Sequence, residues 1–274
     1  MLKGGGKMRS PVVADRFYPG KPADLQDTLH NLVPDVSDDL KQCAIAVISP
    51  HAGYVYSGGV AGETIGQVHV PETVVILGPN HHGAGAPLAL GIEDWRMPLG
   101  DVAIDKELAS RILGSSKVIT QDDVAHVQEH SLEVQVPFLQ YCNSSVKIVP
   151  IVVSHVSYSV CVEAANDLAE AIRNYSRPVM LLASTDMTHY ESRRDASRKD
   201  HLALERIEAL DPKGLYDTVL DNRISMCGIM PTTITLLAAL SLGAKEAQLV
   251  RYTDSGEASG DTSQVVGYAG LIVS

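Results

Sequence analysis

The chain has 274 residues, of which 45% are hydrophobic and 20% charged, and its formal net charge is −11. This composition is typical of a soluble globular protein, and the acidic balance argues against binding to nucleic acid or to an anionic membrane surface. No apolar stretch reaches the ~18 residues that a membrane span needs, so we expect no membrane partner. The opening segment MLKGGGKMRSP lacks the apolar core of a signal peptide, and we therefore expect a cytoplasmic protein.

The chain carries no sign of division into several domains. No Pro/Ser-rich linker, low-complexity tract, long charge run or internal repeat interrupts it. Since α/β folds often run to ~250 residues as one domain, length alone does not require two. We predict a single domain over residues 9–274, preceded by a disordered N-terminal extension over residues 1–8.

Short β-rich runs alternate with segments whose apolar residues recur at helical spacing. In the first half of the chain the patterns predict a helix over 23–33, a strand over 44–48, a helix over 57–67, a strand over 73–77 and a helix over 130–141. In the second half they predict a strand over 146–153, a helix over 158–174, a strand over 179–183, helices over 197–210, 212–220 and 231–242, and strands over 248–252 and 265–273. Pro137 is expected to end or kink the helix in which it lies. Continuous apolar strands are typical of a sheet covered on both faces, so we predict a three-layer α/β/α domain with a central mixed sheet.

Histidine and aspartate, residue types that can bind metals or carry protons, follow three of the predicted strands. His51 follows the first strand, His81 and His82 follow the second, and Asp186 and His189 follow the fourth. Ligands of open α/β sheets bind at the carboxyl ends of the strands. We therefore expect these side chains to gather at one edge of the sheet.

Two further features leave alternatives open. Cys227 precedes the helix predicted to begin at residue 231, where a thiol has a lowered pKa and serves as a ligand or nucleophile; the other interpretation is a buried small thiol. His126, Glu129 and His130 form either the polar start of a helix or part of a site. The exposed-loop setting of His155 predicts a surface side chain.

Five segments together resemble the Memo-like family. They are Pro50-His51-Ala52-Gly53-Tyr54, Gly78-Pro79-Asn80-His81-His82, Glu129-His130-Ser131-Leu132-Glu133, Ser184-Thr185-Asp186-Met187-Thr188-His189 and Cys227-Gly228. The resemblance runs in order over nearly the whole chain from Arg9. It implies a fold similar to the class III extradiol dioxygenases, which use non-haem iron(II).

The resemblance also implies a mononuclear metal site whose ligands are His51, His81 and Cys227. Asp186 and His189 match positions that line the same cleft, and His189 corresponds to the acid/base histidine of the dioxygenases. Those enzymes have a carboxylate where this chain has Cys227, which argues against ring cleavage. Two imidazoles and one thiolate leave open coordination positions, as in catalytic sites, and suit iron(II), copper or zinc.

Four more residues are expected to contact a bound ligand: Tyr54, His82, Glu129 and His130. We expect a metal-dependent oxidoreductase that uses iron(II) or copper and acts on a small molecule. One alternative is a non-catalytic scaffold that binds a peptide in the same cleft, since some members of the family are associated with binding phosphotyrosine peptides. The other is a hydrolase with a zinc-bound water.

Overall fold

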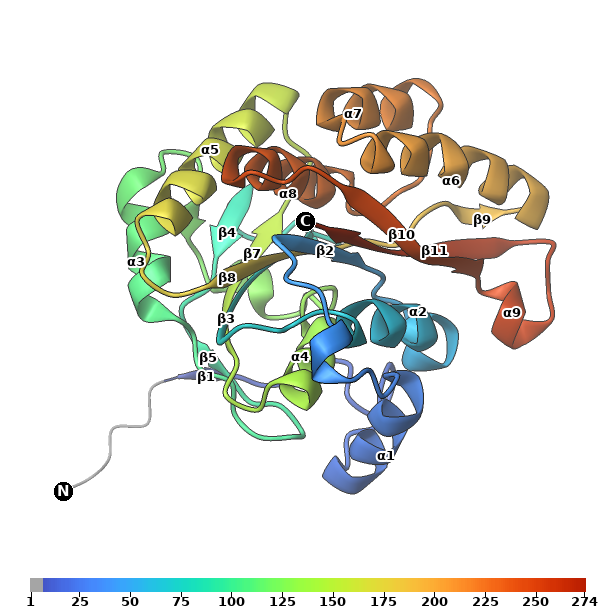
Figure 1. Cartoon of the computed structure of the whole chain (residues 1–274), viewed down its shortest axis with the longest axis horizontal. Coiled ribbons are helices and arrows are strands. Elements are labelled where there is room, and N and C mark those ends of the chain that lie inside the picture. The colour runs from blue at the N-terminus through green and yellow to red at the C-terminus, as the bar shows by residue number, and fades with distance from the viewer. Residues whose placement is uncertain (1–6) are drawn as a thin grey trace.

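The computed structural model describes residues 7–274 (Figure 1). The predicted N-terminal extension, 1–8, lies outside the described residues except for Lys7 and Met8, and Met8 pairs with Asp94 in a short strand. The strands are β1 (Met8–Arg9), β2 (Ala46–Ser49), β3 (Thr73–Pro79), β4 (Leu88–Leu90), β5 (Asp94–Trp95), β6 (Thr120–Gln121), β7 (Lys147–Val153), β8 (Val179–Ser184), β9 (His189–Glu191), β10 (Ala247–Asp254) and β11 (Val265–Val273).

The helices alternate with these strands along most of the chain. They are α1 (Pro22–Leu32), α2 (Tyr54–Gly66), α3 (Lys106–Ser115), α4 (Val136–Cys142), α5 (Tyr158–Arg173), α6 (Arg193–Glu208), α7 (Pro212–Asp221), α8 (Ile229–Leu242) and α9 (Gly256–Ser259). Three 3-10 turns lie at Asp38–Leu40, Val124–His126 and Glu133–Gln135. Within residues 7–274 no helix is long and apolar enough to cross a membrane.

One mixed sheet forms the centre of the domain. Its strand order is β10-β11-β2-β8-β3-β7-β4-β6, and β9 pairs with the free part of β11. The four central strands β2, β8, β3 and β7 are parallel, whereas β11 and β4 run antiparallel to their inner neighbours. The carboxyl ends of β2, β8 and β3 therefore meet at one edge, where α/β proteins place their ligands.

Helices cover both faces of this sheet, as Figure 1 shows. On one face α8 packs on β2, β3 and β8 and is flanked by α5 and α7, while α6 packs on β10 and β11. On the other face α2 packs on β2, β10 and β11 and contacts α1 and α4. Every residue of β3 is buried, which explains its uninterrupted apolar sequence. The predicted three-layer α/β/α class is confirmed.

The structure corrects the prediction for residues 130–141. Residues 130–132 are not helical, a 3-10 turn covers Glu133–Gln135, and the α-helix begins only at Val136. Pro137 lies in the first turn of α4, so it begins this helix instead of ending it. A proline is tolerated there because the first N–H groups of a helix have no partner within it. The non-helical segment before the 3-10 turn places Glu129 and His130 in the candidate site described below.

Candidate metal centre

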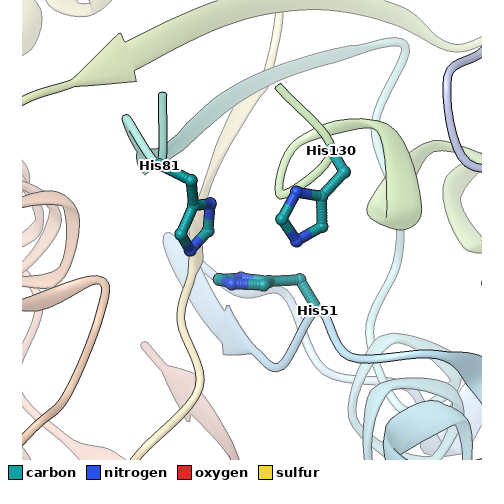
Figure 2. A group of neighbouring side chains, drawn as sticks. All are labelled: His51, His81 and His130. Atoms are coloured by element: carbon teal, nitrogen blue, oxygen red, sulfur yellow. The ribbon is translucent and has the colours of Figure 1, made fainter. Parts of the chain in front are cut away.

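Three imidazoles converge at the carboxyl edge of the sheet. His51 follows β2, His81 follows β3, and His130 lies in the loop before α4; one nitrogen from each lies within 4.8 Å of the others. Figure 2 shows the His81 and His130 rings side by side with His51 edge-on to both. The ring centroids of His81 and His130 are 4.7 Å apart, and that of His51 is 5.3 Å and 5.6 Å from them. Segments about 80 residues apart in the chain thus form one cluster.

The side chain of Ser184 determines which nitrogen of His51 carries a proton. The Ser184 hydroxyl donates its one hydrogen to the carbonyl oxygen of Ser131 at 2.7 Å. It must therefore accept a hydrogen bond from Nδ1–H of His51, which lies 2.9 Å away. This leaves the lone pair of His51 Nε2 free to bind a metal. Ser184 ends β8 and pairs in register with Ser49, two residues before His51, so the sheet itself sets this contact.

The carboxylate of Glu129 holds His81 in the same way. Its Oε2 accepts from the backbone N–H of His81 at 2.7 Å, and its Oε1 lies 2.9 Å from His81 Nδ1. Burial raises the pKa of Glu129, but the hydrogen bonds from His81 and Ser131 outweigh it and hold that pKa below its usual range. An ionised carboxylate only accepts, so Nδ1 of His81 is the protonated nitrogen. Carboxylate partners of this kind orient histidines that bind metals.

Buried His51 and partly buried His130 remain neutral at neutral pH. His51 is 2% exposed, and burial together with the charges of His81 and His130 lowers its pKa well below the usual value. Burial also lowers the pKa of His130 to about 4. A metal ion needs neutral imidazole as its ligand, so these pKa shifts favour metal binding near pH 7.

The thiol of Cys227 lies beside this cluster. Its Sγ is 3.4 Å from His51 Nε2 and accepts from the backbone N–H of Asp186 at 3.2 Å. The sequence predicted a lowered thiol pKa from the nearby helix start; the structure shows the opposite. Burial, followed by the negative charge of Asp186, raises the pKa of Cys227. Deprotonation of this thiol therefore requires a positive charge such as a bound metal ion.

Asp186 and His189 lie at the same edge. Asp186 is 5% exposed, its Oδ1 accepts from the backbone N–H of His51 at 2.8 Å, and burial raises its pKa to about 6. His189 is partly exposed, and its Nδ1 lies 2.9 Å from the carbonyl oxygen of Ser225, which can only accept. Nδ1 of His189 is thus the protonated nitrogen, and Nε2 is left with a free lone pair.

The four residues expected to contact a ligand differ in their burial and in their contacts. His130 belongs to the histidine cluster, and Glu129 is 1% exposed and lies behind His81. Tyr54 is 4% exposed and its hydroxyl donates to the carbonyl oxygen of Val134, so it supports the loop beneath the site. His82 is exposed in the turn after β3.

Sequence reasoning missed the buried arginine that braces this region. Arg9 donates to the carbonyl oxygens of His126 and Glu129 at 2.7 Å and 2.5 Å, and to Glu133 Oε2 at 2.7 Å. Its guanidinium also lies 4.2 Å from the centre of the Trp95 ring. The only signal was the position of Arg9 at the start of the family resemblance.

The donor set fits a transition-metal ion. His51 and His81 each direct an unprotonated nitrogen into the cluster, His130 is its third member, and the thiol of Cys227 contacts His51 from outside this three-histidine group. Nitrogen and sulfur donors suit iron, copper and zinc better than magnesium or calcium. Fold and site together define an α/β protein with a histidine cluster at the carboxyl edge of its sheet.

Comparison with known proteins identifies the family. The model of the Memo-like protein family matches residues 9–272. A MEMO1 family protein of Methanopyrus kandleri is 41% identical over 279 residues, covering 96% of this chain and 98% of the relative. MEMO1 family proteins of Archaeoglobus fulgidus and Methanocaldococcus jannaschii are 41% and 39% identical, each covering 97% of this chain and 99% of the relative. The chain belongs to the Memo-like protein family.

Proposed function

We propose that the protein holds one transition-metal ion through His51, His81 and Cys227 and acts as a metal-dependent oxidoreductase. The observation that carries this proposal is the pair of imidazoles whose Nδ1–H groups are engaged, so that their free nitrogens face the same cluster. Iron(II) and copper are the preferred ions and zinc is the third candidate, because all three accept mixed nitrogen and sulfur ligands.

His130 extends this donor set. Its ring lies 4.7 Å from that of His81, and its ligand atom belongs to the three-histidine cluster. With three protein ligands an ion keeps an open position for substrate, whereas four ligands close the site. We propose that His51, His81 and Cys227 hold the ion and that His130 faces the open position. A bound ion would supply Lewis-acid and one-electron redox chemistry there.

The chain's own residues would move the proton. Nε2 of His189 is free to accept a proton from a bound small molecule, while Nδ1–H stays on the carbonyl oxygen of Ser225. Asp186 holds the backbone of His51 and presents a carboxyl group with a raised pKa beside the thiol of Cys227. We assign His189 as the acid/base group and Asp186 as the residue that keeps the ligand loop in place.

Metal content tests this proposal directly. The protein would be purified anaerobically without a histidine tag and analysed by plasma mass spectrometry beside Cys227→Ser and His81→Ala. Near-stoichiometric iron or copper that is lost in both variants, but kept in the control Cys43→Ser at an exposed cysteine, is the expected result. Equal metal content in all four proteins would refute the ligand assignment. Zinc as the only metal, with ester or amide turnover, would support the hydrolase instead.

A second candidate is a non-catalytic protein that binds a peptide in the same region. A surface cavity of about 510 Å³ is lined by residues that include Phe17 and Tyr54, and the Phe17 ring lies 5.0 Å from that of His130. A peptide in this cavity would reach the edge of the histidine cluster. Tight peptide binding that persists after removal of the metal, with no product formed, would favour this candidate.

A further inference from the structure

A small cavity borders two of the proposed ligands. Its volume is about 140 Å³, room for several water molecules, and its wall includes His81 and Cys227. His155, in the loop that follows β7, lies on the same wall and is exposed to solvent. The cavity therefore extends from an exposed imidazole to two of the three proposed metal ligands.

The inner wall of this cavity carries a second sulfur. Met230 lies in the first turn of α8, three residues after Cys227, and is 5% exposed. Its Sδ lies 3.9 Å from the thiol of Cys161, so the thioether has one weak contact and no strong one. A thioether has no proton to lose and binds soft ions at any pH.

The wall offers oxygen donors only from neutral side chains, those of Asn80 and Ser154. None of the described residues that line the cavity is Asp or Glu, although the chain as a whole carries 33 acidic residues. Magnesium and manganese, which proteins bind mainly through carboxylates, would find no carboxylate among these lining residues. Imidazole, thioether and thiol donors instead match Cu(I), which selects soft ligands.

Among the proposed ligands His81 is exposed and His51 is only 2% exposed, so an incoming ion meets His81 before it reaches His51. We propose that the cavity between His155 and Cys227 is the entrance by which Cu(I) reaches the centre, and that His155 and Met230 bind the ion in transit. This inference rests on the proposed metal-binding function. On arrival the ion replaces the proton on Cys227 Sγ; the proton leaves to solvent, and the charge on copper does not change.

The test compares rates of metal uptake. Cu(I), supplied anaerobically as its acetonitrile complex, would be mixed with metal-free protein in a stopped-flow instrument, and thiolate-to-copper absorption would be followed. The variants are Met230→Leu, which conserves volume, and His155→Gln. Met226→Leu is the matched control, since Met226 is also buried and adjoins Cys227 but does not line the cavity.

We expect Cu(I) uptake to slow by about tenfold in Met230→Leu and in His155→Gln. This factor is the low end of the loss of metal affinity or activity that follows when residues supporting a metal site are removed. Met226→Leu should match the wild type, and Co(II) uptake should be unchanged in Met230→Leu. Wild-type rates of Cu(I) uptake in both test variants would overturn the entrance. Equal slowing of Cu(I) and Co(II) in Met230→Leu would overturn the role of the sulfur.

Failure of the proposed function gives a different result. A wild-type protein that takes up neither Cu(I), Fe(II) nor Co(II) would refute the metal centre itself. A wild-type protein that takes up Co(II) but not Cu(I) would leave the centre standing and refute the copper entrance.

Discussion

Replacing Arg9 by Met is expected to destabilise the protein strongly, although Arg9 lies outside the histidine cluster. Arg9 is 6% exposed and its partner Glu133 is 0% exposed, so the change leaves a buried carboxylate without its counter-charge. Breaking a buried ion pair by removing one partner costs about 3–5 kcal/mol. Three donors remain on Glu133, from the backbone N–H groups of Val12 and Val13 and from the Tyr18 hydroxyl. We therefore expect the free energy of unfolding to fall by about 3 kcal/mol, the lower end of that range.

Urea denaturation followed by circular dichroism measures this loss. The control is Arg96→Met, because Arg96 pairs with Asp101 at 3.9 Å with both side chains mostly exposed. Such a surface change should alter the free energy of unfolding by less than about 0.5 kcal/mol. The double variant Arg9→Met/Glu133→Gln should recover part of the loss, because it removes the stranded charge. A loss below about 1 kcal/mol in Arg9→Met, or no recovery in the double variant, would refute the reasoning.

Three further predictions concern individual side chains. Burial lowers the pKa of His126 to about 4 from 6.5. The contribution of His126 to the free energy of unfolding is therefore complete above pH 6.5, and it falls by about 1.4 kcal/mol per pH unit as the pH drops toward 4. Urea titrations of the wild type and His126→Gln at several pH values should diverge in this window. Glu129→Gln removes the carboxylate that orients His81 and should weaken Co(II) binding by about 10–100-fold, measured by chelator competition; unchanged affinity would contradict the assignment. A Cβ at Gly228 would lie 2.4 Å from Thr185 Cβ. Gly228→Ala should therefore lower both the melting temperature and the metal content. A wild-type melting temperature in this variant would show that the loop shifts to accommodate the methyl group.

The sequence was informative wherever hydrophobic pattern and strand ends determine position. His51, His81 and Asp186 were predicted to gather because they follow strands, and the parallel pairing of β2, β8 and β3 brings those strand ends together. Ser184 was overlooked as a functional residue, since its role depends on a hydrogen bond to Ser131 in a distant loop. No local pattern contains such a contact.

Two errors have the same origin. The helix predicted over 130–141 begins late because the polar residues before α4 are used by tertiary contacts, with Glu129 on His81 and Glu133 on Arg9. The thiol pKa of Cys227 was inferred from its place before a helix, whereas burial in the folded domain dominates it. In both cases the tertiary contacts of the folded domain outweigh a local effect, namely the helical pattern of residues 130–141 and the influence of a helix start on the thiol of Cys227.

The contact between His51 and Cys227 has a consequence for the stability of the whole domain. These residues are 176 positions apart in the sequence, yet Sγ and Nε2 lie within 3.4 Å. An ion bound to both would act as a cross-link that closes most of the chain into a loop and restricts the unfolded ensemble, as a disulfide does. In the loop-entropy description a cross-link of this span is worth about 5 kcal/mol. Metal loading would then govern the free energy of unfolding of the domain as well as its chemistry.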